Sequence, residues 1–525
     1  MTEKLNIDTL HWNIYFILIL SLAISLPLSI FLTSLVEILL MINWLAEGKF
    51  RRKLQLVRGK KSIIIFCSLY VLFIGGLIYT TDFSYAFQNL KLKLPLLVLP
   101  LIIGTSKPFS DKEMNIIFLS FTGGTLISTL VSSALFFTII PFEYTDVREI
   151  SVFISHIRLS LMVVFSFFIL IHFIVTGENH TFLFFPWKLV FVIVCIWFPV
   201  FLFILKSLTG LLIFGIAFLV VAWYYAGKIG NVAPVFIIRV LVITLPLVFF
   251  SYITRSIERF YYREPVDFSS LDKYSHRGNE YYHDTLSDDA ENGHLVWLYI
   301  SEDELREGWN RISSFDYDGK DKRGQDLKFT LIRYLSSKGL RKDQAGIDQL
   351  TKDDIVLVEK GLTNYLFQNR FSLYPRIYEV IWEIDRFRKS KEPGDHSVSQ
   401  RLLYNKAAIY IFLKYPLFGT GTGDIKNELH QYYREYYPGM PVKLRKYPHN
   451  QYLTILMTLG IIGFSLFFCS IFLPVIMERR WKDFIVRIFF LILFLSMLGD
   501  DTLETQTGVS FFAFFYSVLI LGAGC

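Results

Sequence analysis

The stretch HNQYLTILMTLGIIGFSLFFCSIFLPVI, residues 449–476, combines a polar opening with a long apolar run and decides the class of fold. An α-helix needs about 20 mostly apolar residues to cross the roughly 30 Å hydrocarbon layer of a bilayer. This run is long enough, and His449-Asn450 at its start places an imidazole at the expected membrane surface. The stretch therefore predicts a membrane-spanning helix with a titratable group at one end.

Comparable apolar runs recur along the chain, which is 53% hydrophobic and contains 51 Phe. With the first stretch included, they cover residues 12–27, 29–46, 62–79, 92–104, 115–138, 155–175, 184–206, 208–226, 235–252, 449–476, 484–499 and 508–523. The pattern predicts an all-α polytopic membrane protein with about 12 transmembrane helices.

The formal net charge of +7 does not indicate nucleic-acid binding, because the positions of the basic residues fit an orientation signal in a membrane protein. Basic residues concentrate in short segments between apolar runs, above all in 47–61 and 479–482, and such segments lie on the cytoplasmic side under the positive-inside rule. Both termini are then cytoplasmic and residues 253–448 are periplasmic. Lys4 is the only lysine or arginine before the first apolar run, and no small-residue cleavage site follows that run. The first helix is therefore expected to remain as an anchor.

Three regions follow from this arrangement: an N-terminal transmembrane bundle over 1–252, a large periplasmic loop over 253–448 before the tenth helix, and C-terminal transmembrane helices over 449–525. The loop is expected to be mostly helical, because Ser301 to Glu304 and Thr351 to Asp354 have the spacing of a capping box. Short helices are predicted near 302–313, 327–337, 352–364, 374–389, 398–414 and 424–436.

His449 is the strongest catalytic candidate, with Asn450 beside it in support. Imidazole titrates near neutral pH, so it can accept a proton from an attacking hydroxyl. On a continuous helix, which advances about 100° per residue, Gly460 and Gly463 would lie within roughly 40° of the His449 face and let a neighbouring helix approach closely. The alternative is that His449 is only an interfacial polar residue and that both glycines only pack.

Arg401 and Arg158 are the candidates for binding an anion. Arg401 opens an amphipathic segment leading into the turn PLFGTGTG, residues 416–423, and Arg158 lies at the outer end of the sixth apolar run. A guanidinium offers a rigid fork of donors suited to phosphate, and alternating glycines let backbone amides approach an anion. A charge inside the bilayer costs about 2.5–3.5 kcal/mol, so Arg158 either faces a cavity, pairs, or snorkels to the surface.

Further polar residues lie near the same membrane surface. Lys206 is an outer-edge cation after the seventh run, and Arg445 belongs to the basic segment before His449. Glu504 follows Asp500 and Asp501 at the outer end of the last hairpin, where it either orients an arginine or the histidine or lies in a solvated turn.

Metal binding is not expected. The sequence DYDG at 316–319 looks like the start of a calcium loop, but the twelfth position is Leu327 rather than glutamate. The four cysteines lie in apolar runs or at the C-terminus and indicate neither a disulfide framework nor a zinc site. Glu37 lies inside the second apolar run and has no assigned role.

Together these motifs resemble the O-antigen ligase and polymerase superfamily of bacterial envelope glycosyltransferases. The matching positions are Arg401 with Ala407, the turn 416–423, His449-Asn450, Gly460 with Gly463, Arg158, Ser207 to Gly210, and Glu504 to Gly508. The segment TLIRYLSSKGLRKD, residues 330–343, is similar to members of the Bacteroidetes type.

The resemblance implies an inverting, metal-independent transfer of a glycan from undecaprenyl diphosphate to a sugar hydroxyl at the periplasmic face of the inner membrane, with no cofactor. It implies that Arg401 and Arg158 bind the diphosphate and that His449 is the general base. The partners expected are the lipid-linked glycan donor, lipid A-core or another glycan acceptor, and membrane lipids, with no nucleic acid.

Ligation of O-antigen to lipid A-core is the first interpretation. The motifs leave open a repeat-unit polymerase and a protein O-oligosaccharyltransferase, which differ in acceptor. A transporter or flippase for a lipid-linked sugar is an alternative of another class. Such proteins usually carry internal repeats and ionisable groups near the midplane of several helices, whereas only Glu37 clearly lies there in this sequence.

Overall fold

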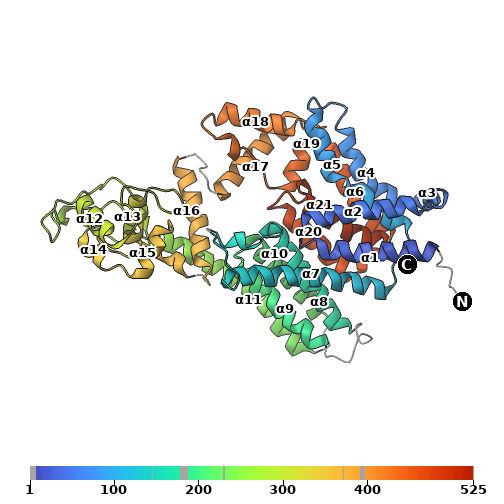
Figure 1. Ribbon diagram of the computed structural model, residues 1–525, viewed down its shortest axis with the longest axis horizontal. Coiled ribbons are helices and arrows are strands. Elements are labelled where there is room, and N and C mark those ends of the chain that lie inside the picture. The colour runs from blue at the N-terminus through green and yellow to red at the C-terminus, as the bar shows by residue number, and fades with distance from the viewer. Residues whose placement is uncertain are drawn as a thin grey trace. The chain divides into compact units, whose positions relative to one another are not determined.

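The computed structural model describes residues 7–144, 146–177, 187–228, 231–369, 372–390 and 397–523, and most of these are helical (Figure 1). Contacts within the chain define two compact units. The first comprises residues 1–221 and 393–525, and the second comprises residues 222–392.

The first unit contains most of the apolar helices. Its elements are α1 (Ile7–Ser25), α2 (Ile30–Ala46), α3 (Phe50–Gly59), α4 (Lys61–Gly75), α5 (Phe83–Lys93), α6 (Pro95–Thr105), α7 (Asp111–Phe136), η1 (Val147–Ile150), α8 (His156–Thr176), α9 (Trp187–Ile204), most of α10 (Leu208–Ala226), α17 (Ser397–Lys414), α18 (Ile425–Tyr436), η4 (Val442–Leu444), α19 (Gln451–Met477), η5 (Arg480–Lys482), α20 (Phe484–Met497), η6 (Thr502–Glu504), α21 (Gln506–Tyr516) and η7 (Ser517–Leu521).

Membrane-length helices confirm the predicted all-α polytopic class. Among the described residues, eight helical spans are long and apolar enough to cross a bilayer, and α2 with α3, bent by 109°, would make a ninth. Three shorter apolar helices, α4, α20 and α21 with η7, complete the set. Within the described residues, each apolar run of the sequence therefore lies largely on a helix.

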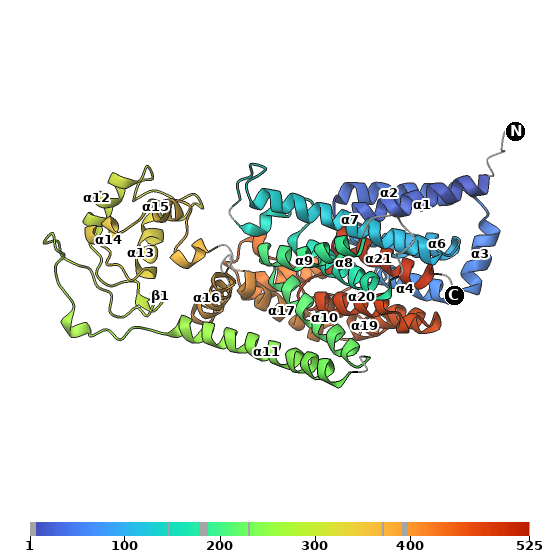
Figure 2. The same ribbon diagram turned by 90° about the horizontal axis from the view of Figure 1, so that it is seen from below.

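Phenylalanine side chains build the core of the first unit. Phe165 of α8 packs edge to face against Phe515 of α21, with ring centroids 4.9 Å apart, and lies 5.6 Å from Phe489 of α20. Helix α8 is apolar on nearly every side, which suits a helix surrounded by others. Helices α1, α2 and α7 pack beside one another, with Gly124 of α7 against the backbone of Ile24 (Figure 2).

The second unit joins one long apolar helix to a smaller helical fold. Its remaining elements are α11 (Val232–Tyr261), η2 (Phe268–Ser270), β1 (Ala290–Glu291), β2 (His294–Leu295), α12 (Glu302–Ile312), α13 (Leu327–Ser337), α14 (Gln344–Asp348), α15 (Lys352–Glu359), η3 (Tyr365–Gln368) and α16 (Tyr374–Ser390). The two strands form an antiparallel hairpin. Leu305, Trp309, Leu331 and Tyr334 are fully buried at the centre of a core shared by α12, α13, α14 and α15.

One of the two predicted capping boxes is present. At α15 the Thr351 hydroxyl accepts from the amide of Asp354, whose carboxylate accepts from the amide of Thr351. At α12 the Ser301 side chain makes no capping bond, so that prediction was wrong. The reason is that Glu304 is buried and used elsewhere: it accepts from the side chains of Ser275 and Asn279 and from the amide of Gln344.

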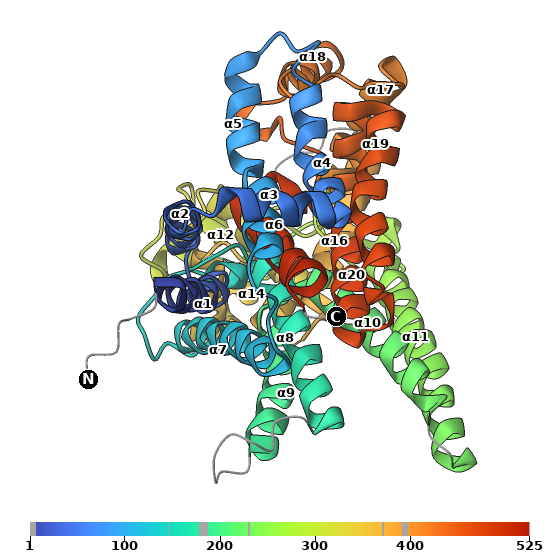
Figure 3. The same cartoon turned by 90° about the vertical axis from the view of Figure 1, so that its right-hand side faces the viewer.

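Helix α19 runs beside α4 (Figure 3) and is interrupted at Gly460, which has φ 63° and ψ −171°. The rings of Tyr452 and Phe468 stack with centroids 6.0 Å apart. In a straight helix these positions would be separated by about 24 Å of rise. The two halves of α19 are therefore turned sharply toward each other, and the expected continuous face carrying His449, Gly460 and Gly463 does not exist.

The segment 416–421 fills the interruption. The amides of Thr420 and Gly421 donate to the carbonyls of Met457 and Thr458, which end the first half of α19. The amides of Ile461 and Ile462, which begin the second half, donate to the carbonyls of Pro416 and Leu417. Backbone polar groups exposed by a broken helix must find partners where water is scarce, and here one short segment serves both ends.

This geometry gives the glycines of the 416–423 turn a structural role. A Cβ at Gly419 would lie 2.4 Å from the carbonyl carbon of Thr458, and one at Gly423 would lie 2.2 Å from the carbonyl oxygen of Asp82. The amides of Thr420 and Gly421 are bonded to protein carbonyls, so they are not presented to an anion. The suggestion that alternating glycines cradle an anion is therefore wrong at these two amides.

Replacing Gly460 with Ala is expected to destabilise the protein. The φ and ψ values at Gly460 are accessible essentially only to glycine, and such strain costs on the order of 1–3 kcal/mol. A Cβ there would also lie 2.3 Å from the Leu417 backbone. The measurement is the thermal unfolding midpoint of the purified protein in detergent.

The matched control is Gly215→Ala in α10, where no atom lies within 4 Å of the added Cβ and φ is ordinary. It should leave the midpoint unchanged or raise it slightly, since Gly to Ala at a compatible site contributes about 0.4–1 kcal/mol. Equal midpoints for the two variants would contradict the assigned role of Gly460.

Candidate functional site

His449 is held by the carboxylate of Asp501. The amides of His449 and Asn450 donate to Asp501 at 2.9 and 3.1 Å, and the Thr454 hydroxyl donates to it at 2.8 Å. Asp501 lies between α20 and α21, so a loop from the end of the chain fixes the start of α19. His449 has a positive φ of 51°, a strained value for a residue with a Cβ. The two hydrogen bonds from backbone amides to Asp501 oppose a change of this backbone conformation.

The imidazole of His449 stays accessible. Its side chain is 36% exposed, and Nδ1 lies 3.8 Å from Asp501 Oδ2, beyond hydrogen-bonding distance. The ring lies 6.1 Å from that of Tyr404 on α17. Asn450 caps α19, accepting from the amide of Leu453 at 3.2 Å. One residue thus presents a reactive nitrogen while its neighbour fixes the helix.

The electrostatic surroundings keep His449 neutral. Burial lowers the pKa of His449 to about 4, and the cations Arg401, Lys446 and Arg158 act in the same direction. Burial raises the pKa of Asp501, as do the Glu504 and Asp500 carboxyls nearby. At neutral pH the imidazole therefore has a free lone pair, as a proton acceptor requires.

Arg158 turns inward and pairs, which decides between the alternatives left open by the sequence. It lies in the first turn of α8, is 13% exposed, and forms an ion pair of 2.6 Å with Asp500, which is 2% exposed. It also donates to the Ser155 hydroxyl at 3.1 Å and to the Asp501 carbonyl at 3.4 Å. Its Nε is buried and has no hydrogen-bond partner among the described residues.

Arg401 reaches the same surroundings from α17. It is half-buried, and its charge acts on both His449 and His156, the first residue of α8. Arg158 acts on the same two imidazoles. Guanidinium groups from α8 and α17 therefore both act electrostatically on an imidazole at the start of α19, although they are far apart in sequence.

The other candidate residues lie in turns or contact neighbouring protein groups. Among the described residues, Glu504 pairs with Lys93 at 2.7 Å and accepts from Gln451 at 3.2 Å. Neither contact is with an arginine or with the His449 side chain. Arg445 donates from Nε and a terminal nitrogen to the Met440 carbonyl at 3.1 and 3.0 Å. Lys206 lies in the turn between α9 and α10, with a positive φ of 50°.

The sequence did not reveal the roles of three residues. Asp500 and Asp501 looked like part of a turn, yet they hold Arg158 and the His449 backbone. Lys93 is fully buried at the end of α5, and no motif of the sequence points to it. A pair of carboxylates directly after an apolar helix was the available signal for the first two, because buried charges in membrane proteins are costly and usually paired.

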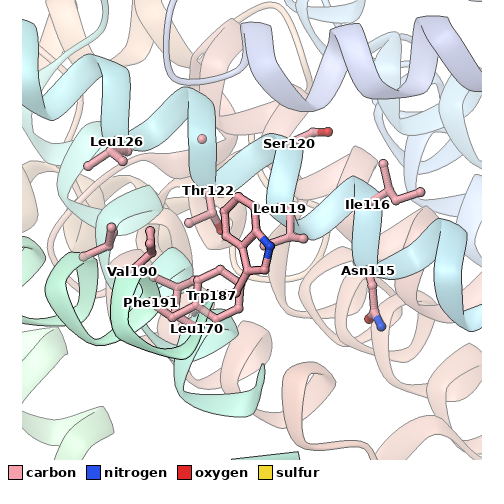
Figure 4. Close-up of a pocket in the computed structure, with 12 residues that line it drawn as sticks. Asn115, Ile116, Leu119, Ser120, Thr122, Leu126, Leu170, Trp187, Val190 and Phe191 are labelled. Atoms are coloured by element: carbon pink, nitrogen blue, oxygen red, sulfur yellow. The ribbon is translucent and has the colours of Figure 1, made fainter. Parts of the chain in front are cut away.

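Two apolar pockets lie elsewhere in the first unit. One, of about 450 Å³, is lined by α7, α8 and α9, with Trp187, Phe191 and Leu119 prominent (Figure 4). The other, of about 770 Å³, lies where segment 416–421 meets α4 and the second half of α19. Neither is lined by His449, Arg401 or Arg158. Within the described ranges, no group of three or more His, Cys, Asp or Glu residues is placed to hold a metal ion.

The pKa of His449 should rise when Arg401 is replaced by Gln, because removing a nearby positive charge favours the imidazolium. Diethyl pyrocarbonate modifies only the neutral imidazole, so the pH dependence of modification at His449, read by mass spectrometry, reports its protonation. We expect a midpoint near 4 in the natural protein and a higher one in R401Q, toward the ordinary value of about 6.5.

Lys414→Gln is the control, since Lys414 lies on the same helix but pairs with Glu428 at 2.9 Å. Its midpoint should equal that of the natural protein. A midpoint in R401Q that does not move would show that Arg401 is too far from His449 to influence it.

Comparison with known families identifies the region around these residues. Residues 356–468 match the family model of the O-antigen ligase, and the match includes Arg401, the 416–423 turn, His449, Gly460 and Gly463. A search of curated proteins finds no match. The match indicates a role in glycan ligation or polymerisation, with lipid-linked glycan and acceptor as the general substrates. The match supports the O-antigen ligase superfamily for residues 356–468.

Proposed function

We propose that the protein transfers a glycan from undecaprenyl diphosphate to a sugar hydroxyl, with lipid A-core as the favoured acceptor. The observation that carries the proposal is an accessible imidazole at His449, whose backbone Asp501 holds and whose pKa is lowered by burial, Arg401 and Arg158. A general base beside two fixed cations suits a reaction in which a hydroxyl attacks and a diphosphate leaves.

In the proposed step His449 accepts the proton of the acceptor hydroxyl while its oxygen forms a bond to the anomeric carbon. The bond from that carbon to the diphosphate oxygen breaks on the opposite face, and its electron pair leaves with undecaprenyl diphosphate. Configuration at the anomeric carbon is inverted. Guanidinium groups stabilise the charge that develops on the leaving group, which is the part a metal ion plays in other enzymes.

Arg158 is suited to binding the diphosphate of the glycan donor because one of its hydrogen-bond donors, Nε, is not used within the described residues. Its Nε is a buried donor without a partner in the described part of the chain, and its ion pair with Asp500 fixes the guanidinium plane. A phosphate oxygen that reached Nε would satisfy that donor without breaking the pair, and because Nε is buried this requires the neighbouring side chains to move. Arg401 would approach the diphosphate from α17.

Donor binding would also strengthen the base. Arg401 and Arg158 both lower the pKa of His449, and a bound diphosphate would offset their charge. The pKa of His449 then rises toward its ordinary value, so the imidazole becomes a better proton acceptor only when a donor is present. In the absence of donor, His449 would therefore stay unprotonated.

The reaction is placed at the periplasmic face of a bacterial inner membrane. This placement follows from the basic segments at 47–61 and 479–482, which favour cytoplasmic termini, and it puts residues 253–448 on the periplasmic side. Lipid-linked glycan and acceptor would then meet near the start of α19.

Replacing His449 with Ala should lower kcat by about 10²–10⁴-fold, the usual contribution of a general base. Replacing Arg401 with Ala should raise KM for the donor and lower kcat, because the leaving group loses a cation in both the ground state and the transition state. The assay uses purified protein reconstituted in liposomes with an undecaprenyl-diphosphate glycan and lipid A-core, with product read by mass spectrometry.

Arg434→Ala is the matched control, since Arg434 is an exposed cation on α18, and it should retain full activity. Activity should survive EDTA. Full product from H449A would remove the proposed base, and product formed only on glycan or protein acceptors would assign a polymerase or an oligosaccharyltransferase instead. Movement of the donor across the bilayer without glycosidic product would favour a flippase.

Topology can be tested independently with Leu286→Cys and Trp481→Cys, at 96% and 49% exposed positions. A membrane-impermeant maleimide should label L286C in cells whose outer membrane alone is permeable, and should label W481C only after the inner membrane is lysed. The unsubstituted protein gives the background from native cysteines. The reverse pattern would place residues 253–448 in the cytoplasm.

A further inference from the structure

Lys93 and Glu504 form a buried ion pair behind the candidate site. Lys93 Nζ lies 2.7 Å from Glu504 Oε2 and 2.6 Å from Asn89 Oδ1, and it lies over the Phe73 ring at 4.8 Å. Lys93 is fully buried and Glu504 is 15% exposed. The pair joins α5 to η6, and both partners belong to the first unit.

Hydrogen bonds connect this pair to Gln451, two residues after His449. Gln451, fully buried in the first turn of α19, donates to Glu504 Oε1 at 3.2 Å and accepts from the amide of Leu503 at 2.7 Å. Gln451 follows His449 and Asn450, whose amides are held by Asp501 in the same 500–504 loop. The loop therefore grips the start of α19 at two points, Asp501 and Glu504.

The charge of Glu504 is felt at the first of these points. Glu504 raises the pKa of Asp501 and acts on Tyr85 and Tyr447, whose hydroxyls are hydrogen-bonded to each other. Tyr447 lies two residues before His449. Removing the Lys93 charge beside Glu504 would therefore disturb both contacts that hold the start of α19, those of Asp501 and of Glu504.

We propose that Lys93 is a positioning residue for the proposed transfer reaction. By neutralising Glu504, it allows the 500–504 loop to hold the start of α19 so that the His449 imidazole points at the acceptor. Lys93 touches neither substrate nor the reacting atoms. The inference rests on the proposed function and adds a residue, at the junction of α5 and α6, that the glycan-transfer chemistry alone would not suggest.

The physical reason for a paired role is the cost of an isolated buried charge. Removing one partner of a buried ion pair leaves the other uncompensated, whereas replacing both with neutral residues of similar shape can be almost neutral. The charges that face His449 are Arg401 of α17, Lys446 of the preceding loop, Arg158 of α8 and Asp501. The Lys93 and Glu504 charges reach it through Asp501, so they act as a balanced pair only when both are present.

The experiment compares K93M, E504Q, the double variant K93M/E504Q and the conservative K93R in reconstituted liposomes. Each neutralising single variant should lower kcat by about ten- to a hundredfold, the scale of a slight misplacement of a catalytic group, with KM for the donor nearly unchanged. The double variant should recover most of kcat, and K93R should retain it.

The pH dependence of His449 modification supplies a readout that folding alone would not move. Loss of the Glu504 charge in E504Q should lower the pKa of Asp501, whose carboxylate then shifts the His449 midpoint to higher pH. The unpaired Glu504 of K93M should raise the pKa of Asp501 and shift the His449 midpoint to lower pH. The double variant should restore the natural midpoint. Thermal unfolding of each variant shows that the compared proteins are folded, and if K93M does not fold, E504Q, K93R and the double variant still decide the question.

Two outcomes would overturn the inference: a double variant as inactive as the singles, or midpoints that do not shift in opposite directions. A rise in donor KM with unchanged kcat would make Lys93 part of donor binding instead. Full activity of H449A would defeat the proposed function itself. Loss of activity in H449A with no effect of the Lys93 and Glu504 changes would defeat only this inference.

Discussion

The carboxylate of Asp501 is the contact on which the geometry around His449 depends. It binds two successive amides and a hydroxyl at the start of α19, and thereby stabilises His449 in a left-handed backbone conformation. Its neighbour Asp500 holds Arg158. Two adjacent residues in one loop therefore fix both an imidazole and a guanidinium, and their spacing is set by a single peptide bond rather than by the packing of separate helices.

A second constraint comes from placing charge among apolar helices. Two largely buried cations have an opposite partner, Arg158 in Asp500 and Lys93 in Glu504, whereas Asp501 is held by two amides and a hydroxyl. Pairing limits the cost of desolvation, and further hydrogen bonds reduce that cost. Lys93 donates to Asn89, Arg158 donates to Ser155, and Gln451 donates to Glu504. The result is a rigid polar layer in which small changes of charge alter the protonation of a neighbour.

The class of fold could be predicted from the sequence because apolar length is a local property, and within the described residues each apolar run lies largely on a helix. Arg401, Arg158 and His449 were predictable as candidates because a charge next to an apolar run needs a reason. Their supports were not predictable. Lys93 and Glu504 are 411 positions apart, and the break at Gly460 depends on a segment some forty residues earlier, so neither leaves a local pattern. The capping box expected at Ser301 failed for the same reason, since distant partners claimed Glu304.

The interruption of α19 also bears on how the chain is made. Segment 416–421, which supplies partners to both half-helices, is synthesised before residues 457–462 leave the ribosome. The carbonyls and amides of the break therefore meet ready partners as they emerge, and need not wait in lipid for a later part of the chain. In this order α17 with Arg401 is synthesised first, and His449 follows with α19. Arg401 and His449 are therefore brought together when the interrupted helix α19 is completed.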